Sequence, residues 1–246
     1  MGKQDASASI ALSNLRTLGR DLGAFIVHPR LPESPMGWSR LVVFLLIAVV
    51  TLDLAIDTTL QVLLEHVDEA VWDLPEQLVF EYSLIGDILS LLIIAPLVEE
   101  ALFRGWLSGH RASLRFAAWG VLAAALFTLT RLPQLADFYL IMMVLAGGIA
   151  ALAFAQWLYT RNRDTAVPPW FARNFRWFVW GSSLAFGVMH LVNFDHLDSP
   201  VDAIIVAPEA LGGMFLAYSR TRFGLRAAMV HHALYNLVYV VIFNLA

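Results

Sequence analysis

Residues 83–107 read SLIGDILSLLIIAPLVEEALFRGWL, an apolar segment long enough to cross a membrane that carries two glutamates and an arginine near its end. Glu100 and Arg104 lie four residues apart on one face of a helix, so we expect them to form an ion pair. Glu99 is turned from that face by about 100° and remains available for chemistry. Pro96 removes a backbone donor and is expected to bend the helix, which helps to open a cavity. Ionisable side chains inside membrane spans are functional by default, although a buried ion pair that only fixes helix register is the structural alternative.

The composition of the whole chain agrees with a membrane location. Of the 246 residues, 59% are hydrophobic and 15% are charged, and the mean hydropathy is +0.68, which is too apolar for an ordinary soluble domain. The sequence therefore predicts an integral membrane protein. It contains no cysteine, which excludes disulfides, thiolate metal sites and a cysteine nucleophile from this chain. The net charge of −4 is small and argues against a nucleic-acid partner.

The N-terminal part is predicted to lie on the membrane surface ahead of the first span. Apolar residues recur at near-helical spacing over residues 8–27, with arginines between them, which is typical of an interfacial helix. Residues 1–22 have no continuous apolar core, so we do not expect a signal peptide there. Trp38 and Arg40 mark the membrane boundary. We therefore divide the chain into an N-terminal cytoplasmic or interfacial segment, residues 1–37, and a single transmembrane domain, residues 38–246.

The predicted fold is all-α, a polytopic bundle of about seven transmembrane helices plus the N-terminal amphipathic helix. Each predicted span is close to the ~20 residues that a bilayer requires. The first span is followed by an expected acidic loop over residues 65–82, which contains no Lys or Arg. The seven predicted spans cover residues 38–62, 83–107, 116–132, 136–159, 174–194, 203–219 and 225–245.

The basic residues predict the orientation of these spans. With this division, 15 of the 16 Lys and Arg residues fall on one side of the membrane, and Arg131 lies on the other. The positive-inside rule assigns the basic side to the cytoplasm. We therefore expect a multi-pass protein of the cell membrane with a cytoplasmic N-terminus.

Polar side chains also occur inside three later spans, and their spacing is helical. A buried polar group without a partner costs about 2–7 kcal/mol, so we expect these groups to converge on one another or on a wet cavity. A lone histidine on an apolar face would more often be a satisfied core residue, whereas convergence of Glu, His and Asn makes a hydrolytic site. The groups are His190 and Asn193 in the fifth span, Glu209 in the sixth, whose place at the site stays ambiguous, and His231, His232, Tyr235 and Asn236 in the seventh.

Three motifs stand in the order of a known family. They are Glu99-Glu100-x-x-x-Arg104, Phe186-x-x-x-His190 and His232-x-x-x-Asn236. Together they resemble the CPBP family, the CAAX protease and bacteriocin-processing group of glutamic intramembrane endopeptidases. The resemblance covers residues 84–246.

The resemblance implies a role for each motif. Glu99 and His190 would position and deprotonate a water, and His232 and Asn236 would hold the oxyanion, with no cofactor and no metal. The implied substrate is a membrane-embedded or lipidated peptide or protein in the lipid bilayer. Supporting residues in this interpretation are Glu100, Arg104, Phe186, Asn193 and Glu209.

The chain departs from the family pattern between its first two motifs. The gap from Glu99 to His190 is longer than the family leads us to expect, as though two spans were inserted, and we place this insert at residues 112–172. Within it, the sequence FTLTR ending at Arg131 imitates the second motif with arginine in the histidine position. We prefer Phe186 and His190, because they keep the histidine and are followed at the expected distance by the third motif. If residues 127–131 were the second motif instead, the chain would have no histidine there to act with Glu99 and would be a non-proteolytic relative.

Three alternative functions remain open from the sequence. A zinc peptidase would hold its metal with His190, His232 and Glu99, but the chain lacks HExxH and asparagine is a poor zinc ligand. A catalytically silent CPBP-like binding or immunity protein would keep the pocket to hold a peptide, and its phenotype would survive the loss of Glu99. A transporter would relay protons through ionisable groups in its spans, but no inverted repeat supports one.

Overall fold

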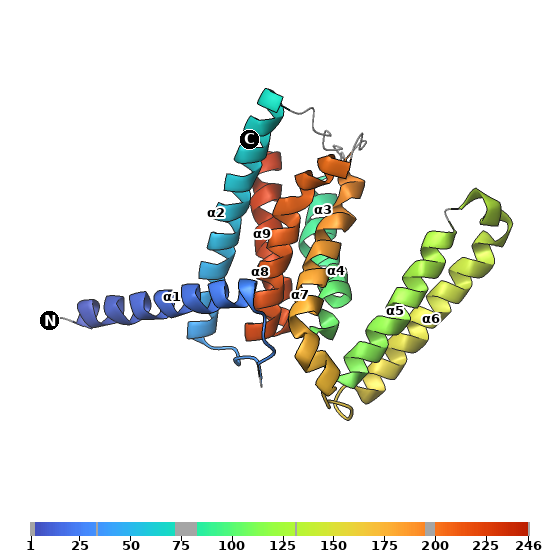
Figure 1. Cartoon of the computed structure of the whole chain (residues 1–246), viewed down its shortest axis with the longest axis horizontal. Coiled ribbons are helices and arrows are strands. Elements are labelled where there is room, and N and C mark those ends of the chain that lie inside the picture. The colour runs from blue at the N-terminus through green and yellow to red at the C-terminus, as the bar shows by residue number, and fades with distance from the viewer. Residues whose placement is uncertain (1–2, 33, 72–82, 131, 195–199, 246) are drawn as a thin grey trace. The chain divides into compact units, whose positions relative to one another are not determined.

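The computed structural model describes residues 3–32, 34–71, 83–130, 132–194 and 200–245 (Figure 1). Within these ranges the protein is all-helical and has no strand, which confirms the predicted all-α class. Where described, the predicted spans are largely helical, but several of them, among them 83–107 and 203–219, are divided between more than one helical element. Among the described helices, three are long and apolar enough to cross a membrane, namely Arg40–Leu64, Gln134–Thr160 and Leu225–Ile242. The number of seven spans and the cytoplasmic N-terminus stay predictions.

The first part of the acidic loop expected over residues 65–82 is helical instead. The helix α2 runs from Arg40 to Val71, so the first residues of the expected loop are helical. The drop in hydropathy suggested a loop, but the helix continues because no Gly or Pro interrupts it before Pro75. The rest of that loop, residues 72–82, and Arg131 lie outside the described residues.

The chain divides into two compact units, which we describe separately. One unit comprises Met1–Arg104 and Phe175–Ala246, and the other comprises Gly105–Asn174. The second unit contains a helical hairpin, in which Phe116 packs against Trp157 with ring centroids 5.8 Å apart. Its elements are η2 (Gly105–Ser108), α5 (Arg111–Leu129), η3 (Pro133–Phe138), α6 (Tyr139–Thr160) and the start of α7 (Pro169–Met189).

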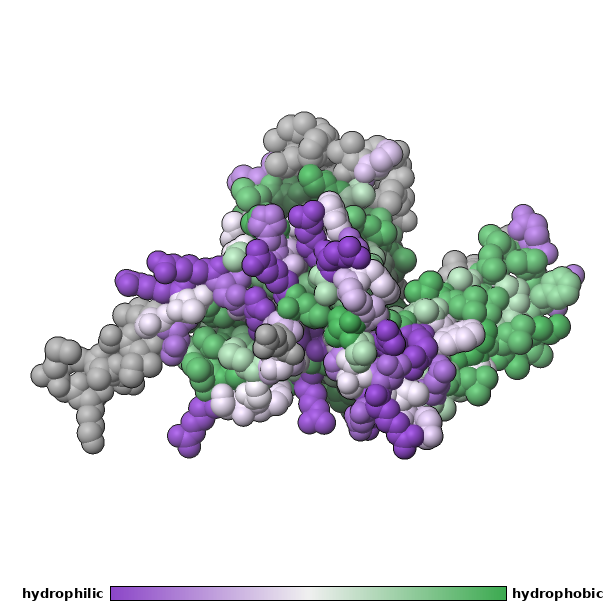
Figure 2. Space-filling model, turned by 60° about the horizontal axis from the view of Figure 1, so that its bottom comes forward, coloured by the Kyte–Doolittle hydropathy of each residue, from purple (hydrophilic) through white to green (hydrophobic). Residues whose placement is uncertain are grey.

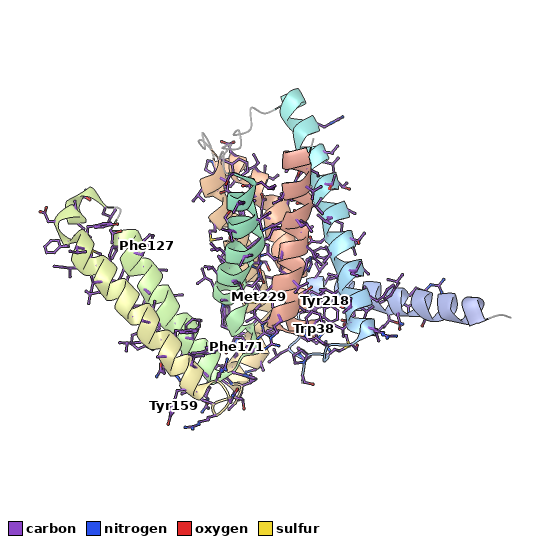
Figure 3. All side chains as sticks on the ribbon, turned by 180° about the vertical axis from the view of Figure 1, so that it is seen from behind. Trp38, Phe127, Tyr159, Phe171, Tyr218 and Met229 are labelled. Atoms are coloured by element: carbon purple, nitrogen blue, oxygen red, sulfur yellow. The ribbon has the colours of Figure 1, made fainter. Side chains whose placement is uncertain are left out.

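The first unit is built around α8 (Ala207–Phe223), which packs against α2 and α9 (Leu225–Leu245). Its residues 213–219 are all buried. Figure 3 shows these helices from behind, with the buried Tyr218 of α8 labelled. The remaining elements of this unit are α1 (Lys3–Val27), α3 (Leu84–Asp87), η1 (Ile88–Ile94), α4 (Ala95–Phe103), most of α7, η4 (His190–Asn193) and η5 (Pro200–Val206).

The predicted N-terminal amphipathic helix is present as α1, and its second half is held against the end of α8. Arg222 donates from Nε and Nη2 to the two carboxylate oxygens of Asp21 at 2.7 and 2.8 Å. The hydroxyl of Tyr218 donates to the same carboxylate at 2.9 Å. Close to this contact, the amide of Met36 donates to the carbonyl of Arg222 at 2.7 Å, which ties the chain ahead of α2 to the end of α8. Figure 2 brings the lower end of Figure 1 forward and shows hydrophilic side chains gathered there.

Candidate active site

The helix that carries the two glutamates contains a widened turn just ahead of them. The segment η1 is a π-helix, in which the amide of Ala95 donates to the carbonyl of Ser90, five residues back. Pro96 follows at the start of α4 and has no amide hydrogen to close an α-helical bond. The bend predicted at Pro96 therefore takes the form of a π-helix, a feature that is frequent at functional sites.

Glu100 and Arg104 form the ion pair that their spacing predicted. Arg104 Nη1 lies 3.1 Å from Glu100 Oε1, and both side chains are 0% exposed. The guanidinium also lies over the ring of Phe186, with Cζ 4.0 Å from the ring centroid, and its Nη2 donates to the carbonyl of Gly213 at 3.3 Å. A Cβ at position 213 would lie 3.0 Å from this Nη2 and 3.1 Å from the backbone of Ser183, so a residue other than glycine would crowd the contact. The first motif is therefore joined to α7 and α8 by one buried cation.

His232 joins the third motif to both glutamates of the first. Its Nδ1 donates to Glu100 Oε1 at 3.0 Å, and its Nε2 lies 3.9 Å from Glu99 Oε2. Oε1 of Glu100 thus accepts hydrogen bonds from both Arg104 and His232. Oε2 of Glu99 is buried and has no hydrogen-bond partner among the described residues.

One ring nitrogen of His190 is bonded to the backbone of the preceding helical turn, and the other can take part in chemistry. His190 opens η4, directly after α7, and its Nδ1 donates to the carbonyl of Phe186 at 2.8 Å. Because a carbonyl can only accept, this bond places a proton on Nδ1 and leaves Nε2 for a substrate or a water. The ring of Phe186 lies between the two histidines, with centroids 4.6 Å from His190 and 5.9 Å from His232.

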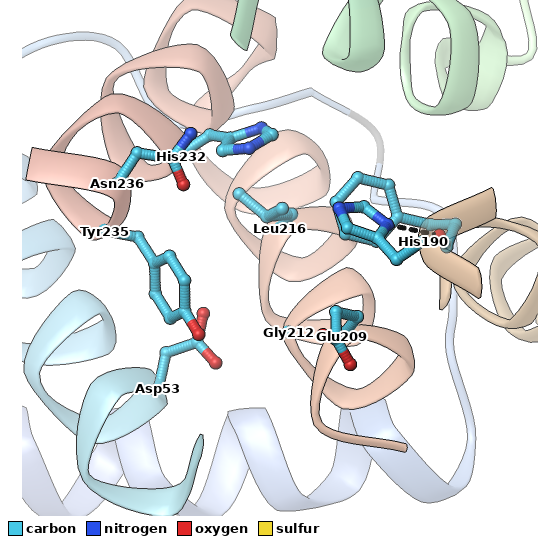
Figure 4. Close-up of a pocket in the computed structure, with 9 residues that line it drawn as sticks. Asp53, His190, Glu209, Gly212, Leu216, His232, Tyr235 and Asn236 are labelled. Atoms are coloured by element: carbon cyan, nitrogen blue, oxygen red, sulfur yellow. Dashed lines mark hydrogen bonds between the residues drawn. The ribbon is translucent and has the colours of Figure 1, made fainter. Parts of the chain in front are cut away.

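Phe186, His190 and His232 line a cavity of about 60 Å³, which has room for more than one water molecule. Figure 4 shows His232, Tyr235 and Asn236 on one side of it and His190 on the other. Glu99 and Asn193 are not among the described residues that line the cavity. Glu99 lies next to it, because its Oε2 is 3.9 Å from Nε2 of the lining residue His232. The lining residues are Asp53, Phe186, His190, Glu209, Gly212, Leu216, His232, Tyr235 and Asn236.

Asn236 is tied to the π-helix. Its Nδ2 donates to the carbonyl of Leu91 at 2.8 Å. In a π-helix this carbonyl would pair with the amide five residues later, but that residue is Pro96, and the amide of Ala95 is taken by Ser90. Asn236 therefore supplies the donor that the proline cannot. Its second amide hydrogen remains available at the cavity.

Replacing Asn236 by alanine is expected to lower stability as well as turnover. The lost hydrogen bond to Leu91 costs about 1 kcal/mol, which for a chain of this size lowers the unfolding midpoint by about 2–4 °C. The check is thermal unfolding in detergent beside the wild type. An unchanged midpoint would contradict the structural bond.

The sequence interpretation missed Asp53, which comes from α2 and lines the cavity. It is 2% exposed, and its Oδ2 lies 3.0 Å from Nε2 of the buried His231. The signal was present, because Asp53 and Asp57 interrupt the apolar first span and intramembrane carboxylates are functional by default. The predicted site rested on three motifs that all lie after α2 in the chain, so it did not include this helix.

The described residues contain no group of three or more His, Cys, Asp or Glu side chains arranged to hold a metal ion. The zinc set considered above, His190, His232 and Glu99, therefore does not have the geometry of a metal site in this structure.

Comparison with known protein families gives a match to the family described as type II CAAX prenyl endopeptidase Rce1-like, over residues 81–172 and 157–238. The first stretch holds the Glu99–Arg104 motif, and the second holds both histidine motifs. Comparison with curated proteins and with solved structures gave no match. The matched stretches together span well over half of the chain. The chain therefore belongs to the Rce1-like family of type II CAAX prenyl endopeptidases.

Proposed function

We propose that this protein is an intramembrane endopeptidase that hydrolyses a peptide bond of a lipidated or membrane-embedded peptide. The observation that carries the proposal is that His232 of the third motif contacts both Glu99 and Glu100 of the first and lines one cavity with His190 of the second. Residues from α4, α9 and η4 supply a base, hydrogen-bond donors and an imidazole nitrogen that can accept a proton. General-base hydrolysis needs these groups.

The two neighbouring glutamates have different tasks in this proposal. Oε1 of Glu100 is occupied by Arg104 and His232, so Glu100 holds the site together. Oε2 of Glu99 has no hydrogen-bond partner among the described side chains, which leaves it able to accept a proton. Glu99 is therefore the general base.

The reaction follows from these assignments. Glu99, with Nε2 of His190 as second acceptor, takes a proton from a water as the water oxygen bonds to the substrate carbonyl carbon. The carbonyl oxygen becomes an oxyanion, which accepts hydrogen bonds from an N–H group at Nε2 of His232 and from the second amide hydrogen of Asn236. The proton held by Glu99 passes to the leaving nitrogen as the carbon–nitrogen bond breaks. The second proton of the water passes by way of Nε2 of His190, so the products are a new carboxylate and a new ammonium group, and no covalent intermediate forms.

We also propose that the helical hairpin is an insertion in the catalytic fold. Residues 105–174 form their own compact unit, and this unit contains the insert placed at 112–172. Residues 38–246 would then be one protease domain of seven spans with a cytoplasmic N-terminus.

A peptide panel tests the proposed substrate class. The purified full chain in liposomes is given a farnesylated peptide with a C-terminal CAAX sequence, the same peptide without the lipid, and an unrelated transmembrane peptide, and products are identified by mass spectrometry. We expect a single cleaved bond in the lipidated or the transmembrane peptide and much slower cleavage of the soluble one. Preferential cleavage of the soluble peptide, or no cleavage of any, would contradict the proposal.

A further inference from the structure

The cavity receives one carboxylate from a helix that lies outside the family match. Asp53 belongs to α2, whereas the matched residues begin at 81. Asp53 is 2% exposed and lines the cavity together with His232. None of the three motifs uses it.

Asp53 fixes the histidine that precedes His232. Oδ2 of Asp53 accepts from Nε2 of His231 at 3.0 Å, and Nδ1 of His231 pairs with the hydroxyl of Ser219 at 2.8 Å. His231 and Ser219 are both 0% exposed, so the ring is clamped at both nitrogens between α2 and α8. A histidine held at both nitrogens has no freedom to turn.

The clamp sets the rotation of α9 at the level of the site. His231 and His232 are consecutive on one helix, so their side chains point about 100° apart. With the ring of His231 held between Asp53 and Ser219, the ring of His232 is directed to Glu99 and Glu100. A rotation of α9 that moved His232 by about 1 Å would misplace a donor of the proposed oxyanion site, and a displacement of this size can cost about 100-fold in rate.

We propose that Asp53 is a positioning residue for the hydrolytic site, which acts through His231 to hold His232 in register with the two glutamates. This inference rests on the proposed function for its effect on turnover, but not for the geometry on which it stands. The hydrogen bond from His231 to residue 53 positions His232, so an uncharged acceptor at residue 53 is expected to keep His232 in place.

The chain offers a matched control one turn further along the same helix. Asp57 is 4% exposed and is also hydrogen-bonded, accepting from Tyr239 at 2.7 Å and from Gln61 at 2.8 Å. It does not line the cavity and is not bonded to His231. Asp57→Ala therefore removes a comparable buried carboxylate without releasing the clamp.

Steady-state kinetics in liposomes test the inference. Asp53→Ala is expected to lower kcat about 100-fold with little change in KM. Asp53→Asn should stay within about tenfold of wild type, since its carbonyl oxygen still accepts from His231. Asp57→Ala should stay within about threefold, because Asp57 does not line the cavity and is not bonded to His231. An unchanged kcat in Asp53→Ala, an equal loss in Asp57→Ala, or an Asp53→Asn protein as slow as Asp53→Ala would each overturn the inference.

Two further measurements keep the test decisive. If Asp53→Ala fails to fold, Ser219→Ala releases the other side of the clamp and should lower kcat about tenfold, while an unchanged kcat would overturn the inference. Histidine ring ¹⁵N spectra need no turnover, so they separate this inference from the proposed function should the wild type prove inactive. The His232 signals should shift in Asp53→Ala and return in Asp53→Asn, whereas unmoved His232 signals in Asp53→Ala would overturn the inference.

Discussion

Glu99→Gln is expected to lower the rate of cleavage about 1,000-fold, within the 10²–10⁴ range that general-base catalysis contributes. The carboxamide has nearly the shape of the carboxylate but cannot take a proton from water. Stability should stay close to wild type, since Oε2 of Glu99 has no hydrogen-bond partner among the described residues and its approach to His232 is 3.9 Å.

The rate is measured on the same peptide and at the same protein-to-lipid ratio as the wild type, with the unfolding midpoint recorded in parallel. A variant that cleaves within about tenfold of wild type would remove Glu99 from the role of base, since that loss is below what general-base catalysis supplies. A large fall in the unfolding midpoint would instead make Glu99 a structural residue.

Glu100→Ala is expected to destabilise the protein by about 3–5 kcal/mol, as the loss of one partner of a buried ion pair does. Arg104 is 0% exposed and would keep its charge without the carboxylate that lies 3.1 Å from it. His232 would lose the acceptor of its Nδ1 hydrogen at the same time. Activity should therefore fall together with stability, unlike in the Glu99 variant.

Glu99→Ala is the matched control, because it truncates the same side chain one residue earlier on α4. It should cost less than about 1 kcal/mol, since the side chain is 21% exposed and its contact with His232 is long, at 3.9 Å. A double variant, Glu100→Leu with Arg104→Met, should recover much of the stability, as apolar replacement of a whole buried pair usually does, and should stay inactive. Equal unfolding free energies for Glu100→Ala and Glu99→Ala would contradict the structural role of Glu100.

The contacts that depend on helical spacing could be predicted from the sequence. The pair Glu100 and Arg104 follows from residues four apart on one helix, and it is present. The meeting of His190 and His232 at one cavity followed from the cost of burying polar groups alone. These predictions needed only local geometry and the membrane as solvent.

Features that depend on partners from distant helices could not be predicted. The bond from Asn236 to Leu91 exists because Pro96 leaves a carbonyl unpaired inside a π-helix, and no spacing rule gives the residue that satisfies it. Asp53 reaches the site because α2 packs against α8 and α9, a contact between segments far apart in the chain. Asn193 was placed at the site by its spacing from His190, but the 3₁₀ turn that starts there changes the helical period, and Asn193 does not line the cavity.

The most direct test of water activation by Glu99 is the cleavage of one farnesylated peptide by the wild-type protein in liposomes, with a metal chelator present and with Glu99→Gln as the parallel sample. We expect the wild type to cut one bond at a rate that the chelator does not change, and the Glu99→Gln protein to cut it about 1,000-fold more slowly. Product formed equally by both proteins, or cleavage that stops when the chelator is added, would contradict a glutamate-activated water as the nucleophile.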